Sequence, residues 1–367
     1  MFKFKSLDKK KTHKKVAVVL LNLGAPDDVT SIQPFLYNFF CDKNIISLPM
    51  PFRAMLSWFI SKRRGPKVAK EVYSHLGGKS PLLENTQAQA DALQKILDKN
   101  KMHNEYKVFV SMRYWHPMSD EVTYKVKAYH PDEVILLPLY PQFSTTTSFS
   151  SITDWKKNAA KAKLEAPTSV IGCYPFDPGF IIASADRVKE AYNTAVKEGE
   201  TNLRVLFSAH GLPEKVINGG DPYQWQCEET AKQIAAATGI KNLDWQICYQ
   251  SRVGPLKWIG PSLDEALEKA AEDGCGILIY PHAFVSEHSE TLVELAIEYR
   301  HEAENLGIDY YMPIKTVGDN DLFIKGLAKL VEDHLGDHQI CAAGKKRLCP
   351  KKFTKCICVE QLDKREV

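Results

Sequence analysis

Four glutamates recur at helical spacing in a segment with the chemistry to handle metal ions or protons. They lie in FVSEHSETLVELAIEYRHEAENLG, which follows an apolar run and is expected to form a helix with Ser286 at its N-cap. Glu287, Glu290, Glu294 and Glu298 are spaced by 3, 4 and 4 residues, so one stripe of that helix carries all four carboxylates. Like charges at these spacings destabilise a helix, which indicates that cations or protons neutralise some of them. The alternative is an ordinary solvent-exposed acidic face.

A histidine stands in a second segment of interest. His210 lies in SAHGLP, directly after the apolar run LRVLFSA, and Gly211 and Pro213 shape a tight turn behind it. This order places the imidazole at the carboxyl end of an expected strand. The alternative is a structural histidine that hydrogen-bonds to the backbone.

Several nucleotide-binding and hydrolase motifs are missing. No GxGxxG follows the first apolar run, and neither a Walker sequence nor a GxSxG elbow occurs. HExxH is also missing, and EHSE is too compact for that kind of zinc site. These observations disfavour dinucleotide enzymes, P-loop proteins, α/β-hydrolases and zinc proteases.

Short runs rich in Val, Ile and Leu alternate with amphipathic segments along the chain. Nearly continuous apolar runs between helices are typical of parallel strands buried on both faces, so the fold class is predicted to be α/β. Helices are expected over 85–100 and 261–274. Strands are expected over 15–23, 106–113, 132–140, 168–176, 203–209, 243–250, 274–282 and 308–317. Ligands of such sheets bind beyond the carboxyl ends of the strands. His210 is expected at one such end, and the acidic segment is expected to begin after another.

The two halves of the chain resemble each other. LYPQFS matches IYPHAF, and VSMRYWHP matches CYQSRVGP at nearly the same offset, whereas LLNLGAP and LFSAHGLP are further apart. The difference predicts an insertion in the first half, over residues 33–81. We therefore expect a first lobe over 15–175, which includes the insertion, and a second lobe over 176–335. The basic N-terminal tail, 1–14, and a cysteine-rich extension, 336–367, flank them.

The first part of the insertion, residues 33–64, combines aromatic and basic side chains and is called the lip segment below. PFLYNFFCDKNIISLPMPFRAMLSWFISKRR reads as two apolar helical pieces broken by Pro49 and Pro51, and it ends on Lys62, Arg63 and Arg64. This pattern suits a surface that lies on a membrane or over a large apolar ligand. An ordinary pair of core helices is the alternative.

Composition excludes further classes. The chain has 367 residues, of which 44% are hydrophobic and 25% charged, as in soluble globular proteins. A net charge of +3 provides no field that would favour nucleic acid. No apolar run is long enough to span a bilayer. The basic N-terminus lacks the apolar region of a secretory signal, so a reducing, cytoplasmic location is expected.

Cysteine is unevenly distributed. Of nine cysteines, five are scattered singly, as expected of small buried hydrophobes. The other four crowd the C-terminal extension, at Cys341, Cys349, Cys356 and Cys358. In a reducing compartment such a group indicates a metal site rather than disulfides, which remain the alternative.

Seven motifs in order resemble the ferrochelatase family, over about residues 15–335. The most specific are SAHGLP, the YQSRVGPLKWIGP segment and the SEHSETL helix; the others are LNLGAPDD, GGKSPLLENT, MRYWHP and LYPQFSTTT. The resemblance implies an enzyme that inserts Fe(II) into protoporphyrin IX, the last step of haem biosynthesis. It also implies two Rossmann-like lobes related by a pseudo-twofold axis, with the porphyrin cleft between them and the lip segment at its edge. Peripheral attachment to a membrane surface through residues 33–64 follows from the same comparison.

The resemblance assigns roles to particular residues. His210 and Glu290 are expected to face each other across the porphyrin as catalytic residues that also meet the substrate iron, and Glu287 and Glu294 to extend a path for iron or protons. A neutral imidazole suits the base that removes pyrrole protons, and carboxylates exchange Fe(II) without trapping it. The expected porphyrin contacts are Leu23, Arg113, Tyr114, Ser144, Trp258 and Phe284.

The C-terminal extension departs from the family pattern. Some ferrochelatases hold a 2Fe–2S cluster with three tail cysteines and one internal cysteine, but the matching internal position here is Thr145. Four thiolates are enough for a cluster, so Cys341, Cys349, Cys356 and Cys358 are expected to hold 2Fe–2S on their own. Structural zinc and no metal at all are the alternatives. Cluster-bearing relatives also imply a homodimer.

Two other functions compete with this interpretation. A chelatase for another tetrapyrrole, such as coproporphyrin III, would need more cations around the lip segment than Lys62, Arg63 and Arg64. A non-enzymatic bilobal ligand-binding protein would have the same overall form, but the acidic stripe and the missing secretory signal disfavour it.

Overall fold

Two parallel sheets form the frame of the protein in a computed structural model that describes residues 13–99, 104–252 and 254–358. Most of the basic N-terminal tail expected over 1–14 therefore lies outside the described residues. The first sheet has the order β2-β1-β3-β4-β9 and the second the order β6-β5-β7-β8. The strands are β1 (Lys14–Asn22), β2 (Asn104–Met112), β3 (Glu133–Pro138), β4 (Thr168–Ile171), β5 (Leu203–His210), β6 (Asp244–Gln250), β7 (Gly276–Tyr280), β8 (Tyr311–Pro313) and β9 (Ile340–Cys341).

All eight predicted strands are present, and they repeat one topology. In each sheet the second strand along the chain lies outside the first, and the third and fourth follow on its other side. Every neighbouring pair is parallel. The predicted α/β class and the predicted duplication are thus confirmed. The ninth strand, from the C-terminal extension, has no counterpart in the second sheet and pairs with β4.

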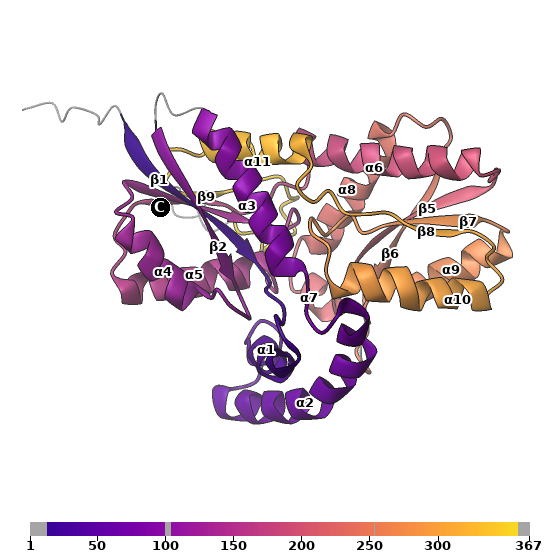
Figure 1. The fold of residues 1–367 in the computed structure, drawn as a ribbon, viewed down its shortest axis with the longest axis horizontal. Helices are drawn as coiled ribbons and strands as arrows, with labels where there is room; N and C mark the ends of the chain where they lie inside the picture. Colours follow the sequence, from indigo (N-terminus) through magenta and orange to yellow (C-terminus); the bar gives the residue numbers. More distant parts are fainter. Residues whose placement is uncertain (1–12, 100–103, 253, 359–367) are drawn as a thin grey trace, which may run out of the picture.

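Helices cover both sheets (Figure 1). Burial drives this arrangement, because strands such as β1 present an unbroken apolar run whose residues Val16–Leu21 are almost completely buried. The helices are α1 (Ile32–Phe40), α2 (Met50–Glu71), α3 (Leu82–Lys99), α4 (Ser119–Ala128), α5 (Ser148–Ala162), α6 (Pro178–Lys197), α7 (Glu214–Asn218), α8 (Tyr223–Ala237), α9 (Leu263–Glu272), α10 (Tyr299–Asn305) and α11 (Asp321–Asp333). Short 3-10 turns, η1 (Val29–Ser31) and η2 (Tyr73–Leu76), flank the α1–α2 hairpin.

One hydrophobic core runs through both lobes. It joins side chains of β1 and β2 to side chains of β5 and β7, and α3, α6 and α11 contribute to it. Figure 1 shows α11 and α6 along one side of the two sheets. The lobes are therefore packed into one body, and the ends of their strands hold fixed positions relative to each other.

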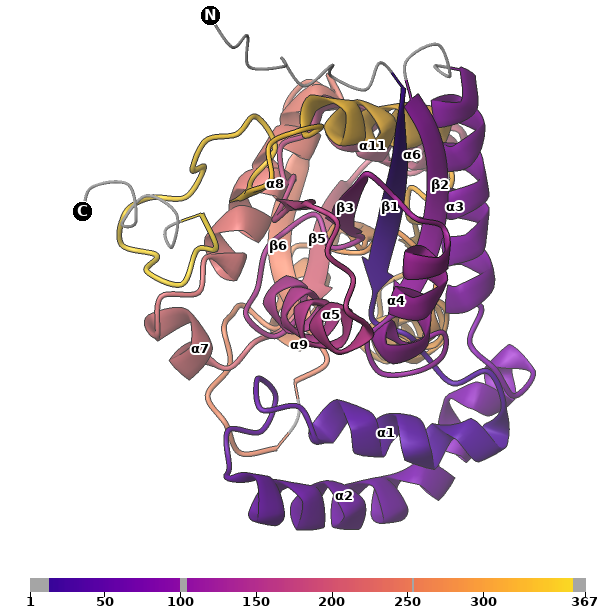
Figure 2. The ribbon, with the colours of Figure 1, turned by 90° about the vertical axis from the view of Figure 1, so that its left-hand side faces the viewer.

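The insertion contains the α1–α2 hairpin, which projects away from the sheets (Figure 2). Pro49 is the N-cap of α2 and Pro51 lies in its first turn, where proline is tolerated, so the predicted break between two helices is present. The side chains of α1 are mostly half-buried. Those of α2 are not: five large apolar side chains are more than half exposed, at Met50, Phe52, Met55, Trp58 and Phe59.

Candidate functional site

His210 and the acidic segment meet where their strands end. His210 is the last residue of β5, and β5 pairs with β7, after which the chain turns toward Glu290. The helix after β7 begins at Glu290, later than predicted, so the expected N-cap at Ser286 is wrong. The Ser286 hydroxyl instead donates to the Gln89 side chain of α3, 2.9 Å away. The turn between β7 and the helix is thus tied to the first lobe.

The helix that carries the glutamates has π geometry. It is η3 (Glu290–Glu298), a nine-residue π-helix that continues into α10. π-helical turns are rare in proteins, and many of those that are known lie at functional sites. Glu287 lies before the helix, where its carboxylate accepts from the Thr316 N–H at 2.6 Å and the Thr291 hydroxyl at 2.5 Å. The carboxylates therefore do not all belong to one helical stripe.

His210 and Glu290 are in direct contact. The His210 Nδ1 and Glu290 Oε2 atoms lie 2.9 Å apart, and both side chains are partly exposed. Burial alone would lower the pKa of His210, but the charge of Glu290 and the hydrogen bond to it raise the pKa above its ordinary value. Burial would likewise raise the pKa of Glu290, yet the charge of His210 lowers it to about 2. The contact therefore favours a charged His210 beside an ionised Glu290, and no ring can lie between them until the contact opens.

Glu294 lies one turn further along η3 with a different proton affinity. Its carboxylate accepts from the Ser251 hydroxyl at 2.7 Å and the Gln250 amide at 3.1 Å. Burial first, and then the charge of Glu290, raise the pKa of Glu294 to about 7. Glu294 can therefore exchange protons near neutral pH, whereas the contact with His210 keeps Glu290 ionised there.

Two further side chains border this pair, and sequence reasoning missed both. The buried His288 has its Nε2 atom 3.9 Å from Glu290 Oε2, and its ring centroid is 4.7 Å from that of Phe284. The Tyr73 hydroxyl of η2 hydrogen-bonds to Ser289. The only sequence signal for His288 was its place between Glu287 and Glu290; Tyr73 had none.

The residues expected to bind porphyrin differ in exposure. Leu23, Trp258 and Phe284 are half-buried. Tyr114 and Ser144 are completely buried, so contact between either of them and a ligand would need side chains to move. Their assignment as porphyrin-binding residues stays a prediction.

Arg113 belongs to a buried polar network centred on Asp42 of the lip segment. Asp42 Oδ2 accepts from Arg113 at 2.9 Å, from the Tyr114 hydroxyl at 2.8 Å, and from the Ser150 hydroxyl. Arg113 Nε also donates to Ser150, 2.8 Å away. Burial would raise the pKa of Asp42, but the Arg113 charge lowers it below its ordinary value. The network ties the lip segment to β2 and to the start of α5.

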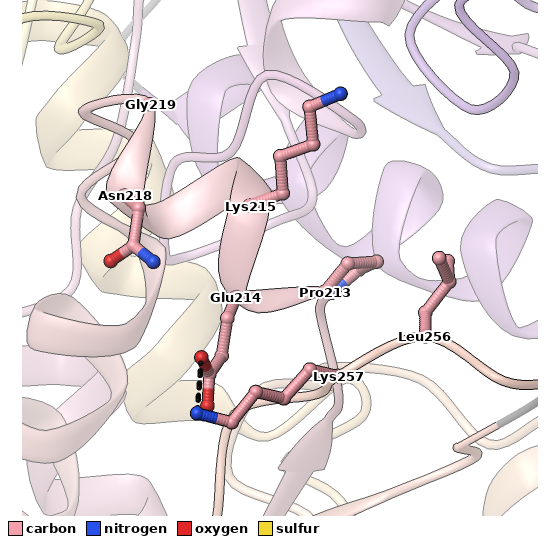
Figure 3. A pocket seen from close by; sticks show the side chains of 7 residues that line it. All are labelled: Pro213, Glu214, Lys215, Asn218, Gly219, Leu256 and Lys257. Carbon is pink, nitrogen blue, oxygen red and sulfur yellow. Dashed lines mark ion pairs between the residues drawn. The ribbon is translucent and has the colours of Figure 1, made fainter.

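A hollow of about 550 Å³ lies on the outer side of the loop that follows His210. The Glu214 carboxylate and Lys257 Nζ pair across it at 3.0 Å (Figure 3). Its lining is Pro213, Glu214, Lys215, Asn218, Gly219, Leu256 and Lys257. None of the predicted site residues lines this hollow, which is separate from the His210–Glu290 pair.

Comparisons with known proteins identify the family. A sequence model described as ferrochelatase matches residues 15–335. The chain belongs to the ferrochelatase family. Ferrochelatases of a Drosophila simulans Wolbachia and of Caulobacter vibrioides are each 49% identical to it, over 86% and 88% of this chain and 98% and 91% of their own lengths. The ferrochelatase of Pelagibacter ubique is 44% identical over 94% of this chain and 99% of its own.

Among solved structures, a sirohydrochlorin chelatase, SirB from Bacillus subtilis subspecies spizizenii in complex with cobalt, matches with a TM-score of 0.49 and 11% identity. It covers 87% of this chain and 95% of its own.

Membership of the family confirms the predicted activity. The protein is an enzyme of haem biosynthesis, a metal chelatase that inserts iron into protoporphyrin, and Fe(II) is its substrate. The non-enzymatic binding protein is not favoured. None of the helices in the described part of this ferrochelatase family member is long and apolar enough to cross a membrane.

The four cysteines of the C-terminal extension come together in a hydrophobic cluster with side chains of α5 and α8. They are called the tail thiols below. Cys356 hydrogen-bonds to Cys349 and to Cys358, and Cys358 to Cys341. These hydrogen bonds lower the pKa of Cys341 and Cys356 and raise the pKa of Cys349 and Cys358. All nine cysteines are free thiols, so the disulfide alternative does not describe this structure.

A fifth thiol lies beside them, which the sequence did not indicate. Cys173 follows β4 and is buried. The N–H of the preceding Gly172 donates to the Cys341 carbonyl at 2.6 Å, and the Ala343 N–H donates to the Cys173 carbonyl at 2.9 Å. Within the residues the structure describes, no three His, Cys, Asp or Glu side chains already have the arrangement of a metal site.

Proposed function

We propose that His210, Glu290 and Glu294 carry out the insertion of Fe(II) into protoporphyrin IX. The observation that supports this assignment is the 2.9 Å contact between His210 and Glu290, with Glu294 as the next carboxylate along the helix. The three groups have pKa values displaced in different directions, which is typical of sites that move protons.

The exchange balances two protons against one dication. The four porphyrin nitrogens bind Fe(II), and their two N–H protons leave. When the His210–Glu290 contact opens, a protonated His210 passes its proton to the Glu294 carboxylate, and the neutral imidazole that remains accepts one pyrrole proton. Glu290, released from its cationic partner, accepts the second. Glu294 ionises near pH 7 and takes protons onward, because it exchanges them readily at neutral pH.

Variants of the pair test these roles. We expect His210→Ala and Glu290→Gln each to lower kcat by about 10²–10⁴-fold, the usual contribution of a positioned acid or base. Porphyrin binding, followed by fluorescence, should persist in both variants. Glu302→Gln, an exposed carboxylate on α10, is the matched control and should retain wild-type turnover. Near-normal turnover of both site variants would overturn the assignment.

The porphyrin preference is tested with the same assay. We propose protoporphyrin IX over coproporphyrin III, because two of the three lip cations already engage aromatic rings: Lys62 lies 4.9 Å from the Trp58 ring centroid and Arg64 6.0 Å from that of Phe40. A higher kcat/KM on coproporphyrin III would reverse this preference.

We also propose that the exposed face of α2 binds a membrane surface. Met55 is 66% exposed and Phe52 60%, and the same helix carries Lys62, Arg63 and Arg64. Apolar side chains that insert between lipids beside cations that meet anionic headgroups are what surface-bound helices combine. The hairpin projects from the sheets, so α2 can approach a bilayer without the lobes in the way (Figure 2).

Vesicle binding tests this surface. Trp58→Asp with Phe59→Asp should weaken binding to phosphatidylglycerol vesicles by more than about tenfold, since each buried side chain contributes about 1.5–3 kcal/mol. Tyr124→Asp changes an aromatic residue of similar exposure on α4 and should bind as wild type. Equal binding of all three proteins would exclude α2 as the membrane surface.

We propose that the tail thiols hold a 2Fe–2S cluster. The donor set fits: Cys349, Cys356 and Cys358 are buried and Cys341 is half-buried beside them. Two N–H groups also donate to sulfur, from Ala342 at 3.2 Å and from Gln226 at 3.0 Å. N–H donors to the sulfurs are a usual feature of such clusters. When bound, the cluster would supply a one-electron centre and a covalent cross-link between segments of the extension.

Metal content decides between the alternatives. We expect two iron and two sulfide per chain and visible charge-transfer absorption, all lost in Cys356→Ser. A colourless preparation with one zinc per chain would show a structural zinc site instead.

A further inference from the structure

Gln226, on the first turn of α8, occupies a buried position between the C-terminal extension and the LYPQFSTTT loop (139–147). Its side chain is completely buried. We propose that Gln226 is a positioning residue that couples the tail thiols to this loop, and through the loop to Arg113. The expected change in reduction potential rests on the proposed cluster, whereas the expected change in the KM for protoporphyrin IX does not.

The amide of Gln226 is used at both of its ends. Its Nε2 atom donates to Cys349 Sγ at 3.0 Å and lies 3.7 Å from Cys173 Sγ. Its Oε1 atom accepts from the backbone N–H of Phe143 at 2.8 Å. The amide meets both requirements of this buried position, to donate to sulfur and to accept from an N–H group, whereas a carboxylate cannot donate and an aliphatic chain can do neither.

A second, parallel link confirms that the start of α8 lies between the same two partners. The Lys355 N–H of the extension donates to the Gly220 carbonyl at 3.0 Å. The next residue, Asp221, accepts from the Thr145 N–H at 2.7 Å and from the Ser144 hydroxyl at 3.1 Å. Figure 2 shows the extension beside α8. A displacement of the extension therefore acts on the loop at two adjacent points.

The loop leads to the polar network of the lip segment. It runs directly into α5, whose residue Ser150 donates to Asp42 and accepts from Arg113. The hydroxyl of Ser151 lies 3.4 Å from that of Tyr140, at the other end of the loop. Because the loop and the first turn of α5 are bound to each other, the position of Phe143 is transmitted to Ser150.

Two physical consequences follow for the two ends of the amide. At the thiol end, an N–H donor to Cys349 stabilises negative charge on sulfur and so favours the reduced form of a bound cluster. At the loop end, loss of the acceptor leaves the Phe143 N–H buried without a partner, which shifts the loop. Each end therefore has its own observable.

The test uses two substitutions that separate the ends. Gln226→Glu keeps an acceptor for Phe143 but removes the donor to sulfur, so the cluster should become harder to reduce while the KM for protoporphyrin IX stays near wild type. Gln226→Leu removes both, so the same shift in potential should accompany a rise in KM of about fivefold, the loss expected from one hydrogen bond, with a smaller change in kcat. Gln224→Leu is the control, because Gln224 lies on the same helix and its amide donates to Glu228 at 2.9 Å.

The outcomes are distinct. The inference is overturned if Gln226→Leu matches Gln224→Leu in both potential and KM. A wild-type protein without cluster absorption would contradict the proposed cluster, and the KM measurement alone would then decide the role of Gln226. If the circular dichroism spectrum shows that Gln226→Leu does not fold, Gln226→Glu becomes the test variant. An unchanged reduction potential of the cluster bound to Gln226→Glu would then overturn the inference.

Discussion

Asp42 is the residue whose replacement most directly tests how the lip segment is held. We consider Asp42→Asn, which preserves shape and removes the charge. Asp42 is 5% exposed and accepts from Arg113, Tyr114 and Ser150 through one oxygen. Asparagine can still accept at one atom, but Arg113, itself 17% exposed, loses its close counter-ion, and Asp154 lies further away, at 3.9 Å.

The magnitude follows from the burial of the pair. Removing one partner of a buried ion pair costs about 3–5 kcal/mol of unfolding free energy. Because the amide retains part of the hydrogen bonding, we expect Asp42→Asn to cost about 2–3 kcal/mol. Since Arg113 is one of the residues predicted to contact porphyrin, we expect the KM for porphyrin to rise as well.

Urea unfolding measures the free energy, and its pH dependence gives a second check. The pKa of Asp42 is lower in the folded protein than in the unfolded chain, so its contribution is fully present above the ordinary aspartate pKa. It is lost as the pH falls through the lower folded value, and the variant should lack this loss. Asp28→Asn, an exposed carboxylate bonded to Thr30, is the control. A variant within about 0.5 kcal/mol of wild type would refute the reasoning.

Three other predictions concern the acidic helix and the extension. We expect wild-type turnover to rise as the pH increases through about 7, because the pKa of Glu294 is about 7 and proton acceptance needs its carboxylate. Glu294→Gln should lack this rise, and a pH profile equal to that of wild type would exclude this role. Gly172→Ala should loosen the extension, because the new Cβ atom would lie 2.7 Å from Ile357 Cγ2. Trypsin should therefore cleave this variant after Lys345 faster than it cleaves the control Gly260→Ala, whose new Cβ atom would have its nearest neighbours at 3.8 Å. Removal of a tail-bound cluster by an iron chelator should lower the midpoint of thermal unfolding of the wild-type protein but not that of Cys356→Ser. An equal decrease in both proteins would show that the chelator acts elsewhere.

The strands were predictable because burial on both faces leaves an unbroken apolar run, as in β1 and β3. His210 and Glu290 were found because each follows such a run, at the edge where ligands of parallel sheets bind. The start of the acidic helix was not predicted correctly. A serine before an acidic segment indicates an N-cap, but Ser286 instead hydrogen-bonds to Gln89 of the other lobe. Tertiary contact overrode a local signal.

Other parts of the site had no local signal at all. Asp42 meets Arg113 across 71 residues of chain, and Gln226 meets Cys349 across 123. Cys173 looked like one more scattered core thiol until folding brought it to the extension. The π geometry of η3 could not be predicted either, because its sequence has the apolar spacing of an ordinary α-helix. Pairings of this kind depend on topology, which a single sequence does not state.

The ninth strand has a consequence for the order in which the molecule is made. In the first sheet the outer partner of β4 is β9 (Ile340–Cys341), which is synthesised after the whole second lobe. During translation the backbone of β4 therefore has no strand on its outer side until the last part of the chain leaves the ribosome. Premature termination before residue 340 would leave this edge open for pairing with another copy, so shortened chains should aggregate rather than fold as smaller enzymes.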